Sequence, residues 1–361
     1  MHTKSLDILV IGTLPPPICG MTLISKRMVE YLSCKHNVTV VAVEEGGMGG
    51  HIRKLVSVWR GLIKIIEKKR QCMWIYLPVD SGLGMFYTML FVFMAYMVGS
   101  RVILHHHSFQ YIDEKDWRMS VIARMLKGKS IHVMLCKKMI RGFKKIYGQE
   151  QYVVQISNLA LMGLPEVGDL NREMGNEIRI GLLSNLCKEK GLDVALALFE
   201  ELRNRGLPVR LLLAGPCRQS ADQNKIYASI EKSNNCVEYR GAVYGEEKEK
   251  FFRDIDVFIF PTLYKVEAEP LVLYEAMAFG VPVIANGKGC IRSQVDSNCG
   301  YIVDKDGNFI NESVEFLQVL FEERLKYRKL AISSRQRVEN ELNVALEGLS
   351  KLEISIGSTV N

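Results

Sequence analysis

The sequence predicts an α/β protein of two Rossmann-like domains that face each other across a cleft. Three observations predict this architecture. β-rich runs alternate with helical patterns along almost the whole chain. A stretch with glycine and proline interrupts that alternation near the middle. At 361 residues and 41.0 kDa, the chain also suits two domains of ordinary size.

The N-terminal domain is expected over residues 1–157. Parallel strands need crossovers about as long as the intervening helical patterns, so we expect a doubly wound parallel sheet. Its predicted strands are Ile8–Ile11, Val38–Val43, Met73–Leu77, Val102–Leu104, Ile131–Leu135 and Tyr152–Ile156. The helical patterns between them include Met21–Cys34, Ile52–Lys69, Trp117–Leu126 and Lys138–Tyr147.

The C-terminal domain is expected over residues 178–340, after a linker at 158–177 that contains Gly163, Pro165 and Gly168. Its predicted strands are Ile178–Leu183, Val209–Ala214, Val237–Arg240, Val257–Phe260, Val281–Ala285 and Tyr301–Val303. Its helical patterns are Leu192–Arg205, Ala221–Lys232, Glu247–Arg253, Leu271–Phe279, Glu312–Glu323 and Tyr327–Leu349. Residues 341–361 form a C-terminal helix or tail that could pack back on the N-terminal domain.

The charge balance does not require a nucleic-acid partner, and none is expected. Hydrophobic residues make up 48% and charged residues 24% of the chain, with a formal net charge of +7. Basic residues cluster in the N-terminal half, at Arg53–Lys54, Lys68–Lys69–Arg70, Lys137–Lys138 and Lys144–Lys145. These clusters favour anionic lipid headgroups or an anionic acceptor, and the alternative is a set of solvated helix faces.

The sequence predicts a cytoplasmic protein. Its N-terminus is polar, without a secretory signal, and its nine cysteines are scattered without the spacing of a zinc site. One segment, Leu83–Val98, is apolar and free of charges, but it is shorter than the ~20 residues that a bilayer requires. A strand follows it at once, so we expect a buried or membrane-grazing helix rather than a spanning one. Peripheral contact with an anionic membrane, at the inner face of the plasma membrane, is a further hypothesis.

Ligands of open parallel sheets bind outside the carboxyl ends of the strands, and phosphates bind at helix N-termini. The first loop of this kind runs from Gly12 to Gly20. Prolines stiffen the loop, and Gly20 leaves room for a ligand near the first amides of the next helix. The loop lacks the dinucleotide and P-loop fingerprints, and a simple turn is the alternative explanation.

A histidine cluster, His105-His106-His107, ends the fourth predicted strand. Side chains alternate along a strand, so His105 and His107 are expected on one face and His106 on the other. No carboxylate or cysteine lies nearby at ligand spacing, so contact with a substrate is favoured over metal binding. A purely structural role is the alternative.

Two later loops carry charged side chains. Lys190 precedes Gly191 at a predicted helix start, where charge and helix dipole both favour a phosphate, with Lys188 as its rival. Glu267 lies in the loop before Pro270, and Glu275 lies within the helix that this proline begins. The free amides of Leu271 and Val272 could bind a diphosphate, and the two carboxylates could accept hydrogen bonds from sugar hydroxyls.

The order and spacing of these segments resemble the GT-B glycosyltransferases of family 4, the retaining "group 1" enzymes of bacterial polysaccharide and lipopolysaccharide synthesis. The segment from Glu267 through Glu275 to Ala-Met-Ala-Phe-Gly-Val-Pro-Val-Ile carries most of the resemblance. The resemblance extends to four further segments: Leu-Ser-Asn with the later Lys-Gly at 183–191, Leu-Ala-Gly-Pro at 213–216, Tyr-Arg-Gly at 239–241 and Asp256-Val-Phe-Ile-Phe-Pro-Thr.

The resemblance implies a role for each matching residue. Glu267 would contact the donor sugar, Glu275 the ribose hydroxyls, and His107 the transferred sugar, with His105 as second choice. Lys190, with the amides of Leu271 and Val272, would hold the diphosphate. Gly20 would let the N-terminal loop close on the diphosphate, Asn185 would lie beside it, and the backbone of Ala242, Val243 and Tyr244 would cradle the base. His107 and Glu267 are the expected catalytic residues.

The chain departs from the family pattern at several of these positions. Asn185 stands where the family usually has Arg, which leaves more of the diphosphate charge to Lys190. Ala268-Glu269 replaces the usual Gly-Phe and adds a carboxylate near the sugar pocket. Ile291-Arg292-Ser293 follows Gly287–Gly289 in place of the common Pro-Glu, so the role of that loop is open.

Two Asp-x-Asp matches are interpreted as structural rather than metal-binding. Asp254-Ile-Asp256 leads into a predicted buried strand, and Asp304-Lys-Asp306 is predicted to be a turn. We therefore expect no metal and no cofactor, with positive charge and helix dipoles stabilising the departing diphosphate.

The resemblance thus implies a retaining hexosyltransferase that uses a nucleotide-diphosphate sugar, UDP-linked rather than GDP-linked. Its acceptor would be a lipid-linked glycan or polysaccharide bound by the N-terminal domain. Two alternatives remain open. One is a GT-B sugar-nucleotide epimerase, which needs no acceptor. The other is an inactive nucleotide-sugar-binding scaffold, which the absence of the usual Arg at Asn185 makes conceivable.

Overall fold

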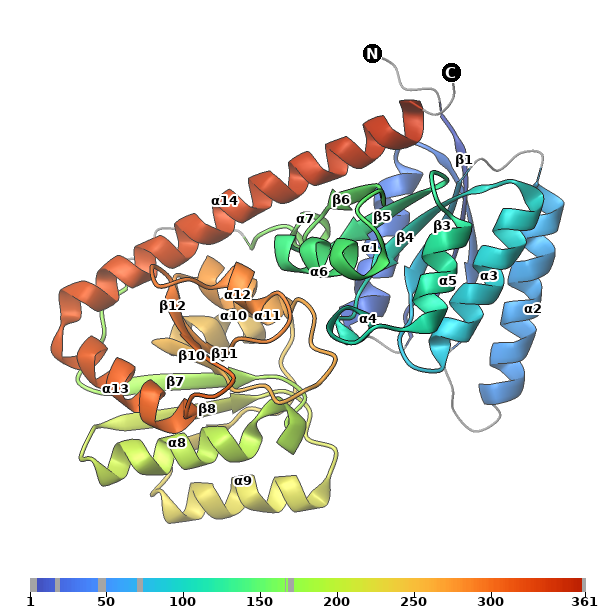
Figure 1. The fold of residues 1–361 in the computed structure, drawn as a ribbon. Helices are drawn as coiled ribbons and strands as arrows, with labels where there is room; N and C mark the ends of the chain where they lie inside the picture. Colours follow the sequence, from blue (N-terminus) through green and yellow to red (C-terminus); the bar gives the residue numbers. More distant parts are fainter. Residues whose placement is uncertain are drawn as a thin grey trace. The chain divides into compact units, whose positions relative to one another are not determined.

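The structure, a computed structural model, describes residues 5–16, 20–44, 50–69, 74–165, 167 and 172–358. The chain forms two compact units (Figure 1). The first contains Met1–Gly163 and Leu342–Asn361, and the second contains Leu164–Glu341. The long last helix, α14 (Arg324–Gly357), therefore contributes residues to both units.

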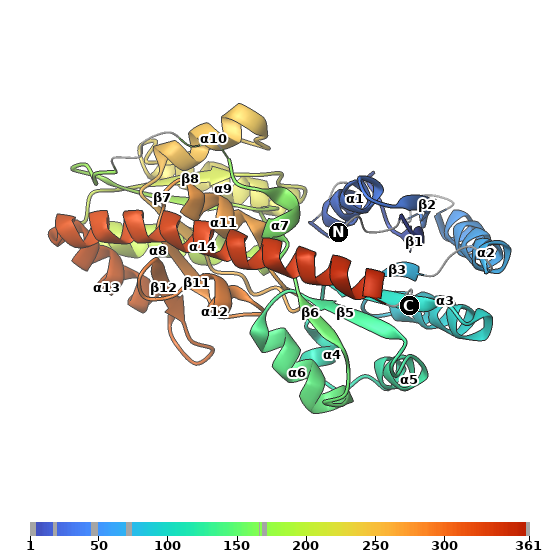
Figure 2. The same ribbon diagram turned by 90° about the horizontal axis from the view of Figure 1, so that it is seen from above.

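The first unit contains a six-stranded parallel sheet in the order β2-β1-β3-β4-β5-β6. Its strands are β1 (Asp7–Gly12), β2 (Asn37–Ala42), β3 (Trp74–Val79), β4 (Arg101–His106), β5 (Ser130–Met134) and β6 (Val153–Gln155). Its helices are α1 (Gly20–Ser33), α2 (Gly50–Lys68), α3 (Gly84–Val98), α4 (Gln110–Asp113), α5 (Trp117–Met125), α6 (Lys137–Tyr147) and α7 (Leu159–Met162). Helices α2, α3 and α5 cover one face of the sheet, and α1 and α7 cover the other (Figure 2).

The C-terminal end of α14 completes the core of the first unit. Leu349, Leu352 and Ile356 are buried in the same cluster as Trp74 of β3 and residues of the neighbouring strands. The indole Nε1 of Trp74 donates a hydrogen bond to the carbonyl of Ile356, 3.3 Å away. Three fully buried aliphatic side chains contribute several kcal/mol, roughly 1.5–3 each, so this unit depends on the end of the chain for its stability.

The second unit contains a six-stranded parallel sheet in the order β12-β11-β10-β7-β8-β9. Its strands are β7 (Ile178–Leu183), β8 (Val209–Ala214), β9 (Val237–Tyr239), β10 (Val257–Phe260), β11 (Val283–Asn286) and β12 (Gly300–Val303). Its helical segments are η1 (Lys188–Lys190), α8 (Leu192–Asn204), α9 (Ser220–Lys232), α10 (Gly245–Asp254), α11 (Leu271–Ala278), α12 (Ile291–Gln294) and α13 (Phe309–Glu322). Helices α8 and α13 pack together on one face, whereas α10 and α11 lie on the other (Figure 1).

The predicted fold class is confirmed, since both sheets are parallel and helices connect their strands. Met73, which begins a predicted strand, lies outside the described residues, as do Arg70, residues 17–19 of the Gly12–Gly20 loop, and positions 166 and 168–171 of the predicted linker. Within the part of the chain that the structure describes, no helix combines the length and apolarity needed to cross a membrane.

Each sheet has one point at which the strand order reverses. In the first sheet the reversal lies between β1 and β3, and in the second it lies between β7 and β10. The loops that leave these strands diverge to opposite faces, which opens a crevice at their carboxyl ends where ligands of such sheets bind. The sites described below lie at these two positions.

Candidate functional site

The charged centre of the second unit lies at its reversal point. Lys190 ends the short η1 helix after β7, and Glu267 lies in the loop after β10. The Lys190 Nζ lies 2.6 Å from the Glu267 Oε2, and both side chains are largely buried. Thr262 donates its hydroxyl to the same carboxylate oxygen at 3.0 Å. Lys190 also lies over the ring of Tyr264, 4.4 Å from its centroid. The structure therefore holds a cation and a carboxylate together at the place where the strand order predicts a ligand.

Two glycines allow the surrounding loops to approach this centre. Gly191 has a φ of +87°, and a Cβ there would collide with the carbonyl of Pro261. Gly289 has a φ of +51°, and a Cβ there would collide with the carbonyl oxygens of Glu267 and Ala268. Both positions require glycine for backbone conformation and for space. The Gly287–Gly289 loop, whose role the sequence left open, is thus packed against the backbone that carries Glu267.

Glu275 is a partly exposed residue of α11, although it lies in an apolar stretch of sequence. Its neighbours Tyr274 and Ala276 are buried, so the helix turns Glu275 away from the core. The Lys248 Nζ, from α10, lies 2.6 Å from the Glu275 Oε1. The apolar sequence around Glu275 therefore does not mean that its carboxylate is buried among apolar side chains. Glu275 keeps about a quarter of its side chain exposed, 26%, and has a cationic partner.

The first turn of α11 presents backbone donors beside the charged centre. Pro270 precedes the helix, and no side chain caps this end. Leu271 and Val272 are partly exposed, and the first amides of a helix have no carbonyl partner within it. The free N–H groups and the positive end of the helix dipole would attract an anion here. Leu271, Val272, Glu275 and the Lys190–Glu267 pair are therefore placed by elements that meet at one edge of the sheet.

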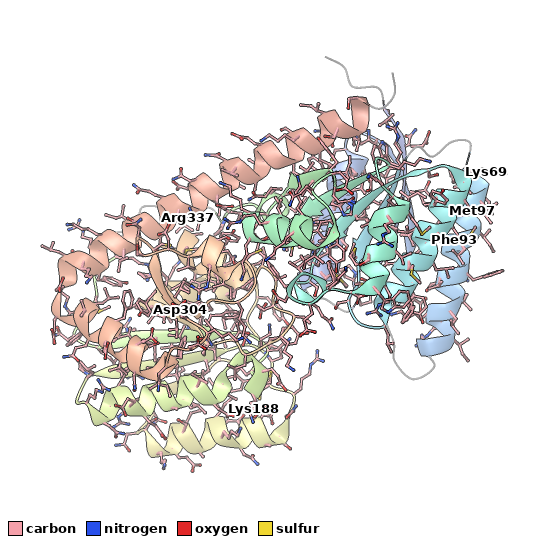
Figure 3. The ribbon with its side chains drawn as sticks, in the orientation of Figure 1. Lys69, Phe93, Met97, Lys188, Asp304 and Arg337 are labelled. Atoms are coloured by element: carbon pink, nitrogen blue, oxygen red, sulfur yellow. The ribbon has the colours of Figure 1, made fainter. Side chains whose placement is uncertain are left out.

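The other predicted donor-site residues differ in exposure. Asn185 is exposed in the loop after β7, and Lys188, labelled in Figure 3, is exposed in the same turn as Lys190. Ala242 and Tyr244 are exposed just before α10, whereas the side chain of Val243 is buried. Only backbone atoms of Val243 can therefore face a ligand.

Gly20 belongs to the first unit and is the first residue of α1. A Cβ added there would meet no heavy atom within 4 Å. The residues before it, 17–19, are outside the described part of the chain.

Two functional candidates, Lys248 and Lys288, were not predicted from the sequence, and two others, Glu269 and Thr262, were noted there without their contacts. Lys248 was not predicted because a lysine in an exposed, charge-rich helix is expected to face solvent. Lys288 donates its ammonium to the carbonyl of Leu263 at 2.7 Å, and burial lowers its pKa. Glu269, noted as a departure from the family, is buried, and its Oε1 accepts a hydrogen bond from the hydroxyl of Tyr274 at 3.3 Å. Thr262 lies in the quoted Phe-Pro-Thr segment, but only the structure shows that it contacts Glu267.

The histidines of β4 form a buried network in the first unit. His105 and His107 share a face, with ring centroids 4.1 Å apart, and Tyr76 pairs with the His105 Nδ1 at 2.6 Å. On the other face, His106 bridges Tyr111 and His132 through contacts of 2.9 Å each. Among the described residues, the Nε2 atoms of His105 and His107 have no hydrogen-bond partner. His107 is partly exposed as a residue, but its unpaired Nε2 is buried.

Burial keeps these histidines neutral. It lowers the pKa of His107 to about 4 and that of His132 to about 3, and holds those of His105 and His106 well below the ordinary value. In the unfolded chain each would have a pKa of about 6.5. His107 would therefore meet a substrate as a neutral hydrogen-bonding group and not as a cation.

These pKa values predict that the first unit loses stability in mild acid. Between about pH 6.5 and pH 4 these histidines bind protons in the unfolded chain, whereas the same histidines stay unprotonated in the folded chain. The free energy of unfolding should therefore fall by up to about 1.4 kcal/mol per histidine and pH unit. Burial raises the pKa of Asp256 to about 6. Protonation of this carboxyl in the folded state raises the free energy of unfolding as the pH falls through the same range, which opposes the effect of the histidines. Thermal unfolding from pH 7.5 to pH 4.5 should show a falling midpoint, with a shallower fall for His132→Asn. A midpoint independent of pH would contradict this assignment.

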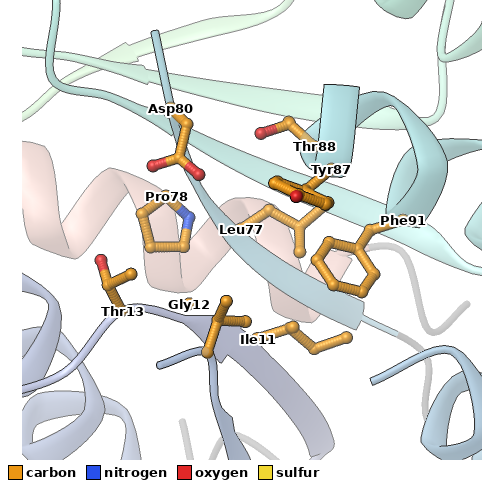
Figure 4. Close-up of a pocket in the computed structure, with 10 residues that line it drawn as sticks. Ile11, Gly12, Thr13, Leu77, Pro78, Asp80, Tyr87, Thr88 and Phe91 are labelled. Atoms are coloured by element: carbon orange, nitrogen blue, oxygen red, sulfur yellow. The ribbon is translucent and has the colours of Figure 1, made fainter. Parts of the chain in front are cut away.

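A hollow lies at the reversal point of the first sheet. It measures about 320 Å³, including the part open to solvent, and its lining comes from the ends of β1 and β3 and from α3. Figure 4 shows Thr13, Pro78 and Asp80 on one side and Tyr87 and Phe91 on the other. The Thr13 hydroxyl is buried and has no partner among the described residues. This hollow could accept a small polar group.

The two Asp-x-Asp segments have structural contacts. Asp254 pairs with Arg240 at 2.8 Å, and the partly buried Asp256 accepts the backbone N–H of Arg179 at 2.8 Å. Asp304 begins a turn closed by the Gly307 amide. Over the described ranges, no group of three or more His, Cys, Asp or Glu side chains is arranged to hold a metal ion.

The fold is that of the GT-B class of glycosyltransferase structures. The structure matches that of Anabaena Alr3699/HepE in complex with UDP and glucose, with a TM-score of 0.65 and 14% identity over 96% of this chain and 99% of that one. It matches sucrose-phosphate synthase from Thermosynechococcus elongatus with a TM-score of 0.70 and 15% identity over 98% and 100% of the two chains. These likenesses establish the fold.

The sequence of the second unit is similar to a known family of transferases. Residues 171–337 match the model of Glycosyl transferases group 1. The capsular polysaccharide biosynthesis glycosyltransferase CapM of Staphylococcus aureus is 28% identical over 229 residues, which are 62% of this chain and 57% of that protein. The amylovoran biosynthesis glycosyltransferase AmsK of Erwinia amylovora is 22% identical over 253 residues, covering 61% and 62%. The match thus spans about three-fifths of the length of these relatives.

Proposed function

We propose that this protein transfers a hexosyl unit from a nucleoside-diphosphate sugar to a glycan acceptor during the synthesis of a cell-surface polysaccharide. The observation that carries the proposal is the charged centre at the reversal point of the second sheet. There the Lys190–Glu267 pair lies beside the open N-terminus of α11, which also carries Glu275. A cation and free amides suit a diphosphate, and carboxylates suit the hydroxyls of the two sugars that flank it.

Each group has a distinct part in the proposed reaction. Lys190 and the amides of Leu271 and Val272 neutralise the diphosphate as it departs, which is where negative charge develops. Glu267, already oriented by Thr262 and Lys190, accepts hydrogen bonds from the donor hexose. Glu275 accepts those of the ribose. Positioning and charge stabilisation supply the catalysis, so the pair of carboxylates that a glycosidase uses is not needed.

The reaction is proposed to retain the anomeric configuration and to need no metal. The acceptor hydroxyl attacks from the face that the diphosphate leaves, and the diphosphate oxygen receives its proton. His107, neutral at physiological pH, hydrogen-bonds the transferred hexose, and the hollow beside Thr13 and Asp80 receives the acceptor. UDP is the proposed carrier, and the HepE structure in complex with UDP supports this choice over GDP.

The test is a calorimetric binding screen with UDP, GDP, ADP and their hexose conjugates. UDP and at least one UDP-hexose should bind the wild type, and magnesium should not be required. Failure of all nucleoside diphosphates to bind would refute the proposal. Turnover of a bound UDP-hexose to its epimer without acceptor would indicate the epimerase alternative. Donor binding without turnover over a broad acceptor panel would indicate the scaffold.

A further inference from the structure

Helix α2 carries apolar side chains on two faces. Val58, Leu62 and Ile65 are buried against the first unit. A separate set points to solvent and comprises Ile52, Leu55, Val56, Trp59, Ile63 and Ile66. Their spacing of three or four residues places them in one stripe along the helix. Trp59, near the middle of this stripe, is 65% exposed. The core therefore does not account for the second stripe.

The neighbouring helix α3 repeats this arrangement. Phe86, Leu90, Phe93 and Met97 are exposed at intervals of four, three and four residues, and Leu83 extends the row. The helix contains no charged residue. Met97 is 63% exposed, and Figure 3 labels it with Phe93 on the outer side of α3. The apolar segment that the sequence predicted to be buried or membrane-grazing is thus buried on one side only.

The stripes of α2 and α3 belong to one continuous surface. Helix α3 packs against both α2 and α5, and the views in Figures 1 and 2 show the helices side by side. Trp117 of α5, which is exposed, contacts the ring of Phe86 in an edge-on geometry at 6.1 Å. More than half of the exposed large hydrophobic side chains described lie on or beside these three helices. Monomeric soluble proteins rarely gather so many apolar side chains in one place.

Basic side chains border this surface. On α2, Arg53, Arg60 and Lys64 follow one another at intervals of seven and four residues and so form a row beside the apolar stripe. Glu67 is the one acidic residue in the sequence of α2, against five Lys and Arg residues. Arg53 pairs with Glu44 at 3.7 Å, and Lys64 pairs with Glu67 at 2.9 Å. Both pairs are exposed to solvent, where ion pairs are weak. On α5, Arg124 adds an exposed positive charge, whereas Arg118 is paired with Asp116 at 2.6 Å.

We propose that α2, α3 and α5 form a docking surface for an anionic lipid bilayer. A bilayer interface matches both properties, since the apolar stripe can enter the acyl boundary while arginine and lysine reach the headgroups. Tryptophan is favoured at that depth because its ring is apolar and its N–H is polar. A second copy of the chain would match the apolar stripes but would bring the basic rows of two identical surfaces together.

When docked, helices α2, α3 and α5 would lie along the membrane surface and would not cross the bilayer. The inference deepens the proposed function, because it implies that the acceptor is presented at a membrane surface and carries a lipid. Its test, however, needs neither donor nor acceptor. Lipid binding and UDP binding can be measured on the same sample, so the two proposals can fail separately.

Vesicle flotation tests the surface directly. The wild type should float with vesicles of phosphatidylglycerol and phosphatidylcholine at least about tenfold more than with phosphatidylcholine alone, and high salt should weaken this binding. Trp59→Glu should reduce the bound fraction about tenfold or more. The matched control is Ile354→Glu on α14, where the native side chain is 68% exposed but isolated from the surface. This control should float like the wild type.

A second measurement uses the unaltered surface. In Trp117→Phe the emission of Trp59 should shift to shorter wavelength when anionic vesicles are added, whereas the buried Trp74 should not respond. Flotation of Trp59→Glu equal to that of the wild type would overturn the proposal. So would a wild-type dimer that Trp59→Glu converts to a monomer, without vesicle binding by either protein, because the surface would then be covered by a second copy.

Discussion

Replacing Lys190 with alanine is expected to lower kcat for sugar transfer by about 100- to 1000-fold, the usual effect of removing one donor to a developing oxyanion. Lys190 is suited to this role by its place after β7 and by its immobilised ammonium, which Glu267 holds at 2.6 Å and the Tyr264 ring covers. Asn185 supplies no charge and Lys188 is exposed, so Lys190 is the lysine of this loop that is held beside Glu267. Steady-state kinetics with saturating acceptor would measure the effect.

The controls separate charge from structure. Lys188→Ala removes an exposed lysine from the same turn and should leave kcat unchanged, whereas Lys190→Arg keeps the charge and should restore part of the activity. Lys190→Ala also leaves the Glu267 carboxylate with only the Thr262 hydroxyl among its present partners, so its thermal midpoint must be compared with the wild type. If Lys190→Ala kept full kcat while Lys188→Ala lost it, the assignment of the two lysines would be wrong.

Most of the fold could be predicted from the alternation of strand and helix patterns in the sequence. Short β-rich runs separated by helical patterns could be recognised locally, because the inner strands are buried on both faces and helices must cover them. The local pattern could also place Lys190 and Glu267 at loops after strands. It could not show that β7 and β10 are neighbours, because strand order is set by crossovers and not by any one segment. The Lys190–Glu267 contact therefore joins residues that no spacing rule relates.

Other features of the site depend on tertiary packing alone. Gly289 seemed to belong to a loop of unknown role, yet its lack of a Cβ lets that loop reach the backbone of Glu267. The sequence showed the basic clusters of α2, but the exposed apolar stripe could be recognised only when the buried side of the helix was known. A periodic pattern identifies that a helix is amphipathic, but it does not identify which face meets the core.

Glu275→Ala is expected to weaken UDP binding about 100-fold. A carboxylate that accepts two ribose hydroxyls contributes about 1.5–3 kcal/mol for each hydrogen bond, and the loss of about 3 kcal/mol in total corresponds to this factor. Glu275→Gln keeps one acceptor oxygen in place and should lose about tenfold. Isothermal titration with UDP and with free diphosphate would check the assignment. Only UDP binding should respond, because the diphosphate does not contain the ribose.

Lys248 allows the role of Glu275 to be examined by a double-mutant cycle. Its Nζ lies 2.6 Å from the Glu275 Oε1, so it fixes the carboxylate while the Oε2 stays available to a ligand. Both side chains are partly exposed, so the pair itself should contribute less than about 1 kcal/mol to stability. Lys248→Met should therefore weaken UDP binding only a few-fold in the wild type and not at all in Glu275→Ala. An equal loss in both backgrounds would contradict a positioning role, because Lys248 would then bind the nucleotide independently of Glu275.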